Sequence, residues 1–264
     1  MPTAIRFQAL NRWLPVTGHC EPGRPGATTR LCHSTGHPSR CRDAGGVGLG
    51  IACAGHYAWC VTLDQLTTTT RKGLPVIMAP FVPAEAGRVF ELCQDKEIQR
   101  WTTVPSPYPR GAADQFVEEY TPPAWREVAD GRFSSQKAGT ELVWGVRVGG
   151  DSPLTGLWGS LGLKRHGNGA VEIGWWLGAA VRGRGIMRAA VEKVVEAAFD
   201  PAFVIRASVV QWFALVGNVP SAAIAQRTGF RFTGTCDHAT GRCWSAVIEP
   251  GDVIGPRDDW PDLV

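Results

Sequence analysis

The sequence has no long run of apolar residues, no clustered basic face in its larger part, and only three tyrosines. Its least polar segment, residues 45–63, is interrupted by glycines and His56, so it lacks the dense aliphatic content of a membrane span. Residues 61–264 hold 21 basic and 22 acidic residues, which argues against a nucleic-acid-binding face. No secretory signal opens the chain, so we expect a cytoplasmic protein with reduced cysteines.

Residues 1–60 have few large aliphatic side chains and no helix or strand period, and they are rich in Arg, Gly, Pro, Thr and Cys. Such a segment cannot offset its ordering entropy, so we predict a low-structure N-terminal extension. Cys32, His33, His37 and Cys41 suggest zinc, but their spacing matches no common zinc module. We expect no metal. A metal-binding N-terminal module stays as an alternative that would need zinc in the purified protein.

The extension has a second interpretation, in which the natural protein starts near Val61, whose codon can serve as a bacterial start. Residues 1–60 would then be an over-extended gene prediction. Intact mass of the protein from its native host tests this hypothesis, and a mass that includes Met1 would exclude it.

The most informative stretch reads as strand, glycine turn and helix. Residues 170–177 are aromatic and branched, the turn carries Gly183 and Gly185, and residues 186–199 place apolar side chains at helical spacing. A glycine turn that leads into a helix start gathers free backbone N–H groups, which favours a phosphate. No Gly-Lys-Ser/Thr end follows, and Arg188 stands where a dinucleotide fingerprint has its third glycine.

Four segments in order resemble the GNAT acetyltransferases, and specifically the ribosomal-protein-alanine N-acetyltransferase (RimJ/RimL-like) branch. The turn R-G-R-G-I-M (residues 182–187) is similar to the (Gln/Arg)-x-x-Gly-x-(Gly/Ala) pyrophosphate loop, although Met187 replaces the small last residue. The other three segments are Asp95–Trp101, the strand Glu172–Leu177, and Asn218-Val219-Pro220-Ser221 followed by Gly229-Phe230. The resemblance covers roughly residues 74–252.

The hydrophobic periods predict the order β-α-α-β-β-β-α-β-α-β-β. This order agrees with an α/β (α+β) fold of the GNAT type, with a mixed, mostly antiparallel sheet flanked by helices. We predict one strand over residues 203–211, a connector over residues 95–111, a GNAT domain over 74–252 and a mobile tail over 253–264.

The resemblance implies acetyl-CoA as cosubstrate and assigns roles to the loop. The pyrophosphate would bind the backbone of Arg182, Gly183, Arg184, Gly185, Ile186 and Met187, with the two arginines adding charge-assisted bonds. The N–H of Leu177 would polarise the thioester carbonyl. Asn218 would bond the pantetheine arm, and by the same resemblance Ser221 would act on the departing thiolate. Many GNAT enzymes have a tyrosine there, but no tyrosine follows the loop in this chain, so either Ser221 or water would serve. The alternatives are solvated turn charges for the arginines, a helix cap for Asn218, and a first-turn helix residue for Ser221.

On the acceptor side, Glu172 is the general-base candidate, acting through water, because a carboxylate in so apolar a strand is costly without a role or a partner. A salt bridge to a neighbouring arginine is the alternative. Trp101 and Tyr108 could line the substrate entrance, or they could belong to the core.

We therefore predict an acetyl-CoA-dependent N-acetyltransferase whose acceptor is a protein N-terminal α-amine. A small-molecule amine (polyamine, amino acid or antibiotic) is the alternative within the enzyme class. A non-catalytic acyl-CoA-binding regulatory module is the alternative from another class. A homodimer stays open.

Overall fold

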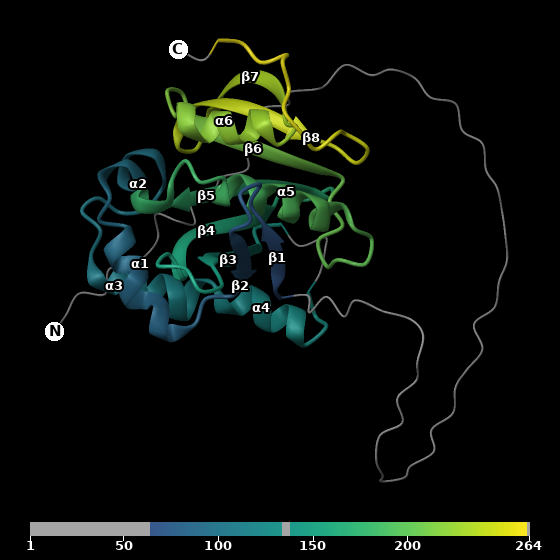
Figure 1. Ribbon diagram of the computed structural model, residues 1–264. Coiled ribbons are helices and arrows are strands. Elements are labelled where there is room, and N and C mark those ends of the chain that lie inside the picture. Colours follow the sequence, from purple (N-terminus) through teal and green to yellow (C-terminus); the bar gives the residue numbers. More distant parts are fainter. Residues whose placement is uncertain (1–63, 134–137, 263–264) are drawn as a thin grey trace, which may run out of the picture. The chain divides into compact units, whose positions relative to one another are not determined.

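The structure, a computed structural model, describes residues 64–133 and 138–262 (Figure 1). The extension predicted for residues 1–60 and the zinc interpretation lie outside these residues. Within them, no helix combines the length and the apolar character needed to cross a bilayer.

The fold centres on one sheet of eight strands in the order β1-β2-β3-β4-β5-β6-β8-β7. All neighbouring pairs are antiparallel except β5 and β6, which are parallel, so the expected mixed and mostly antiparallel sheet is confirmed. The strands are β1 Leu66–Thr69, β2 Pro75–Ala79, β3 Glu141–Val148, β4 Gly156–Arg165, β5 Ala170–Leu177, β6 Val209–Leu215, β7 Arg231–His238 and β8 Gly241–Ile248.

Helices pack against the sheet through two separate apolar clusters. One cluster joins α5 to the sheet residues Leu161, Leu163 and Ile173. The other joins α1, α2 and α3 to Val143, Leu157 and Trp176. The helices are α1 Ala86–Leu92, α2 Lys96–Trp101, α3 Arg110–Gln115, α4 Pro122–Ala129, α5 Ile186–Phe199 and α6 Val219–Arg227, with short 3₁₀ turns at Pro83–Glu85 and Ala179–Val181 and a π turn at Phe116–Tyr120.

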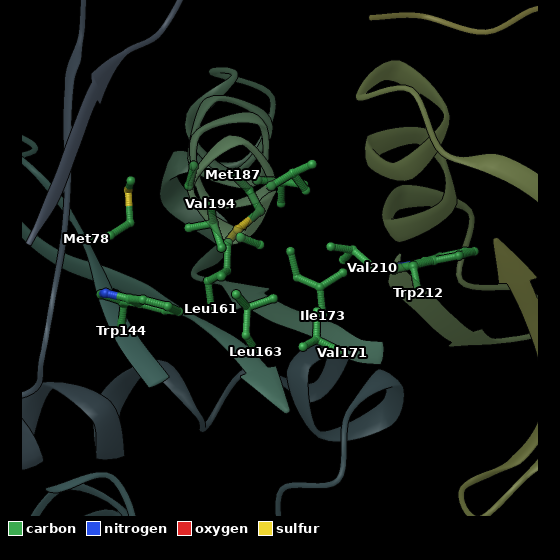
Figure 2. Packing of buried hydrophobic residues seen from close by; sticks show 14 of the residues in the cluster. Met78, Trp144, Leu161, Leu163, Val171, Ile173, Met187, Val194, Val210 and Trp212 are labelled. Atoms are coloured by element: carbon green, nitrogen blue, oxygen red, sulfur yellow. The ribbon is translucent and has the colours of Figure 1, made fainter. Parts of the chain in front are cut away.

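Strand β5 separates these clusters by simple alternation. Val171 and Ile173 are buried against α5, whereas Glu172, Gly174 and Trp176 face the other side. Figure 2 shows Met187 and Val194 of α5 directed toward Leu161 and Ile173. This packing fixes where the β5–α5 loop emerges from the core.

Some elements differ from the sequence-based expectation. The strand expected over residues 203–211 is β6 at Val209–Leu215, because Phe203 and Ile205 are buried in the preceding loop while the β6 register is set by β5 and β8. The connector expected over residues 95–111 contains α2, which Asp95 caps by accepting from the Glu97 N–H at 2.8 Å. Strand β1 and helix α4 were not expected.

The C-terminal segment also differs from the expected mobile tail. Trp260 is buried, its Nε1 donates to the Phe230 carbonyl at 2.7 Å, and its ring lies 5.7 Å from that of Trp212. The Arg257 N–H donates to the Gln226 carbonyl at 3.1 Å. Residues up to at least Trp260 therefore pack with the domain.

Candidate active site

Strands β5 and β6 separate at their C-terminal ends. Their pairing runs from Ala170–Val209 to Ile173–Trp212 and stops there. The Gly178 N–H donates to the Trp158 carbonyl on the β4 side at 2.8 Å. Along an antiparallel strand, every second residue directs its N–H and C=O groups toward the neighbouring strand. Gly178 bonds to β4, so Trp175 and Leu177 direct their N–H groups away from β4, toward the opening. The opening thus has backbone donors along one wall.

The loop after β5 delivers further donors to the same region. Gly183 and Gly185 have φ values of +75° and +80°, a left-handed conformation that favours glycine, and Gly185 is the N-cap of α5. Among the described residues, the N–H groups of residues 183–188 have no protein acceptor. A Cβ built on Gly183 would meet nothing within 4 Å, so the space above the loop is open. This arrangement suits a phosphate at the positive end of the helix.

Met187 is compatible with this geometry. Its side chain is 2 % exposed and points into the core, as Figure 2 shows. The larger residue at this position therefore leaves the N–H side of the loop clear.

A cavity of about 610 Å³, here called the loop cavity, opens over the β5–α5 loop. It is bounded by the β1–β2 turn, the C-terminal end of β5, the first turns of α5, and α6. Its lining includes Arg71, Lys72, Arg184 and Arg227, none of which has an acidic partner among the described residues. The cavity therefore combines free cationic side chains with free backbone N–H groups, as a polyphosphate requires.

Arg182 is held differently from Arg184. Its Nε donates to the Leu177 carbonyl at 2.9 Å and its Nη2 donates to Asp95 at 2.5 Å. Because Asp95 also caps α2, Arg182 links that helix to the end of β5. We assign Arg182 a positioning role, although it lines the loop cavity.

Asn218 and Ser221 lie at the start of α6. Asn218 is the N-cap, and its Oδ1 accepts from the Ser221 N–H at 3.3 Å, so the helix-cap interpretation is confirmed. The amide nitrogen of Asn218 has no hydrogen-bond acceptor within the described part of the chain and stays available to a ligand. The Ser221 hydroxyl accepts from the Trp212 indole at 3.2 Å.

A second cavity of about 610 Å³, here called the sheet cavity, lies over the face of β3, β4 and β5 that carries Glu172. The two cavities share six lining residues, which are Trp101, Thr102, Trp175, Trp176, Asn218 and Ser221. They therefore meet at the opening between β5 and β6. Leu177 and residues 182–187 line the loop cavity, whereas Glu172 lines the sheet cavity, so the structure places the two groups on opposite sides of the junction.

Trp101 lies at this junction. Its Nε1 donates to Glu97 at 2.8 Å, and a Cβ on Gly217 would approach its ring to 3.3 Å. It thus bridges α2 and the β6–α6 loop. Tyr108 also lines the sheet cavity but is only 5 % exposed, and burial raises the pKa of its hydroxyl. Tyr108 therefore lies in the wall of the cavity.

The floor of the sheet cavity carries a row of charges that the sequence analysis missed. Glu141, Lys164 and Glu172 are opposed across β3, β4 and β5, and the next row contains Gly162 opposite Gly174. Gly174 leaves open space beside the charges, whereas the Glu141 side chain lies over Gly162 and fills the place where a Cβ would stand. Strand alternation would have revealed this row if the register between the strands had been known. The register is set by tertiary contacts, so it could not be read from the sequence.

The pKa values of Glu141 and Lys164 are shifted in this floor. The Tyr120 hydroxyl donates to Glu141 at 2.5 Å, and burial raises the pKa of Glu141. Burial lowers the pKa of Lys164, against the attraction of Glu172 and Glu141.

Glu172 pairs with two histidines and not with an arginine. Its Oε2 lies 2.9 Å from His166 Nε2 and 3.8 Å from His238 Nε2. Burial favours the neutral carboxyl, but the histidine contacts outweigh it and lower the pKa of Glu172 to about 2. Burial also opposes charge on His238, yet contacts with Cys243 and Glu172 raise its pKa to about 9. Glu172 is therefore ionised throughout the physiological range.

Within residues 64–133 and 138–262, no group of three His, Cys, Asp or Glu side chains has the geometry to hold a metal ion. The side chains that line both cavities are three tryptophans, the amide of Asn218 and the hydroxyls of Thr102 and Ser221.

Comparison with known families gives one direct match. A family model described as acetyltransferase (GNAT) domain matches residues 76–231. No curated protein sequence matches the chain.

Several solved structures share the fold at low identity. RimL, a ribosomal alpha-N-protein acetyltransferase in complex with coenzyme A, is 14 % identical with a TM-score of 0.54, over 69 % of this chain and 95 % of RimL. Mycobacterium smegmatis RimJ, in complex with a CoA disulfide, is 17 % identical with a TM-score of 0.54, over 71 % and 88 %. The microcin self-immunity acetyltransferase MccE, in complex with acetyl-CoA and AMP, is 18 % identical with a TM-score of 0.53, over 66 % and 92 %.

Proposed function

The chain belongs to the GNAT acetyltransferase family, and from this premise we propose that it transfers an acetyl group to a protein N-terminal α-amine. It is an acetyl-CoA-dependent N-acetyltransferase. The acceptor and the roles of individual residues are the proposal. The observation that carries it is the pair of cavities that meet where β5 and β6 separate.

The loop cavity would hold coenzyme A. The N–H groups of residues 183–188 and the side chain of Arg184 would bind its pyrophosphate, and Arg71, Lys72 and Arg227 would add positive charge. Asn218 would offer its free amide N–H₂ to the pantetheine arm. Acetyl-CoA supplies an activated acyl group whose carbon accepts a nitrogen nucleophile while the sulfur leaves.

Leu177 would polarise the acetyl carbonyl through its N–H. The alternation of β5 turns this N–H toward the opening, and Arg182 holds the carbonyl of the same residue at 2.9 Å. A fixed donor of this kind contributes roughly 3 kcal/mol to the transition state, by analogy with oxyanion holes.

Glu172 would act on the acceptor amine by charge and through water. Its pKa of about 2 makes it a weak proton acceptor, so the general-base role that the sequence suggested needs revision. Transfer to it from an α-ammonium of pKa about 8 costs about 8 kcal/mol, whereas loss of that proton to water at pH 7 costs about 1.4 kcal/mol. We propose that Glu172 attracts the ammonium and that solvent takes the proton.

The weakness of this base favours an α-amine over a lysine. A lysine of pKa about 10.4 would need about 4.6 kcal/mol to become neutral at pH 7. RimL, a ribosomal alpha-N-protein acetyltransferase whose fold the chain shares, supports a ribosomal-protein N-terminus as the first acceptor to test.

One observation favours the small-molecule alternative. Glu141, Lys164 and Glu172 in the cavity floor are half-buried charges that could bind the polar groups of a compact amine. The fold shared with MccE is consistent with it.

Release of the CoA thiol by the full chain tests the proposal, with short peptides compared against polyamines, amino acids and aminoglycosides. We expect release with free peptide N-termini and none when the same peptides are N-terminally blocked. Release only with small amines would support the alternative. Binding of acetyl-CoA without release on any amine would favour the regulatory-module interpretation.

A further inference from the structure

Trp212 occupies the point at which β5 and β6 separate. It is opposite Ile173 in the last pair of the parallel ladder, and it is 1 % exposed. Its ring stacks with that of Trp175 at 6.5 Å and meets that of Trp260 at 5.7 Å. Packing on two sides thus fixes the direction in which its indole N–H points.

That N–H is directed at Ser221. The Nε1 atom lies 3.2 Å from Ser221 Oγ. An indole nitrogen can only donate, so the Ser221 oxygen must accept in this bond. The hydroxyl hydrogen of Ser221 is then free for another acceptor, and none lies within the described part of the chain.

Ser221 is also fixed from its backbone side. Its N–H donates to Asn218 Oδ1 at 3.3 Å, which sets the first turn of α6. Its side chain lines both the loop cavity and the sheet cavity. Because no acceptor for it lies among the described residues, its free hydrogen is available to a ligand at the junction of the two cavities.

We infer that Trp212 is a positioning residue that makes Ser221 a hydrogen-bond donor toward the sulfur that leaves during acetyl transfer. This inference rests on the proposed function. In the overall transfer the C–N bond forms, the C–S bond breaks, and its electron pair goes to sulfur. Ser221 stabilises that sulfur by hydrogen bonding, and the proton lost by the nitrogen to solvent balances the one that the sulfur finally gains from solvent.

The kinetic test compares Trp212→Phe with Trp260→Phe. Both substitutions remove one buried indole N–H from the same aromatic cluster. The N–H of Trp212 donates to Ser221, whereas the N–H of Trp260 donates to the Phe230 carbonyl. We expect Trp212→Phe to lower kcat roughly 3- to 10-fold at pH 7 with little change in KM. Trp260→Phe keeps an aromatic ring packed against Trp212 and should leave kcat unchanged.

Two further measurements distinguish a positioning role of Trp212 from a purely structural role. In a Ser221→Ala background, Trp212→Phe should have no additional effect on kcat. In the unliganded protein, the indole N–H resonance of Trp212, assigned with the Trp212→Phe variant, should shift in Ser221→Ala, while that of Trp260 should not move.

Equal kcat for Trp212→Phe and Trp260→Phe, or an unmoved Trp212 resonance in Ser221→Ala, would overturn the inference. If wild-type protein releases no CoA thiol with any amine, the proposed function fails instead. The resonance measurement still decides whether the hydrogen bond exists in that case.

Discussion

The Nε2 atom of His166 lies 2.9 Å from the Oε2 atom of Glu172, and the same oxygen is 3.8 Å from His238. The three residues come from the β4–β5 turn, the middle of the sheet and the end of β7. A carboxylate in the sheet cavity is thus stabilised as an anion by two imidazoles. This relationship determines how the protein should respond to pH.

We expect the free energy of unfolding to fall as the pH rises from 6.5 to 9. The pKa of His238 is raised from 6.5 to about 9 in the folded protein, so the folded state keeps a proton that the unfolded state loses. The stabilisation is complete below pH 6.5 and is lost as the pH passes about 9, amounting to up to about 3 kcal/mol. The lowered pKa of Glu172 arises from the same ion pair, so it adds no further stabilisation to the value of about 3 kcal/mol. Urea denaturation at several pH values measures the slope.

Glu172→Gln is the control for this prediction. It removes one of the two contacts that raise the pKa of His238, so the slope between pH 6.5 and 9 should fall by about half. The affinity for CoA should stay unchanged, since Glu172 lines only the sheet cavity. Identical slopes in the variant and the wild type would show that Glu172 does not hold His238 in its charged form.

The sequence predicted the loop side of the site well because its signals are local. Strand β5 and helix α5 have the predicted bounds, since alternation and helical spacing are complete within residues 170–199. The glycines that give the loop its left-handed φ values are visible in the sequence alone.

The acceptor side could not be predicted because it is assembled across the sheet. His238 reaches Glu172 only through the order β5-β6-β8-β7, and Glu141 reaches the same floor only through the β3–β4 register. A carboxylate within an apolar strand indicated that Glu172 needs a partner. His166 stands only six residues before Glu172 in the adjoining turn, but nothing along the chain showed that His238 is the second partner.

Gly185→Asp should weaken acetyl-CoA binding by at least about 100-fold. It places a side chain and a negative charge at the helix N-terminus, against the pyrophosphate. Titration calorimetry with acetyl-CoA measures the effect. Gly139→Asp is the matched control, because it introduces the same charge at a glycine with φ +83° that lies outside both cavities. It should bind acetyl-CoA with normal affinity. If Gly185→Asp binds acetyl-CoA with undiminished affinity, the loop is not part of the binding site.

Arg182 and Arg184 should differ in their coupling to Asp95. Arg182 bonds Asp95 at 2.5 Å, whereas Arg184 has no acidic partner in the described residues. The losses in CoA affinity for Arg182→Gln and Asp95→Asn should therefore not add in the double variant. Arg184→Gln should weaken CoA binding about 3- to 10-fold, more so at low salt, and should add fully to Asp95→Asn. Additive losses for Arg182 and Asp95 would contradict the positioning role of Arg182.

Removal of the C-terminal segment should destabilise the domain, although the sequence suggested a mobile tail. Trp260 is 8 % exposed and packs against Trp212 and Phe232, while Val253 of the same segment is 79 % exposed. Trp260→Ala should lower the free energy of unfolding by about 3–5 kcal/mol, the usual cost of emptying a tryptophan site. Val253→Ala should change it by less than about 0.5 kcal/mol. Thermal unfolding of both variants, and of a chain that ends at Asp252, gives the comparison. A truncated chain that melts like the full-length protein would mean that the Trp260 packing contributes nothing, and the domain would then end where the sequence first placed its boundary.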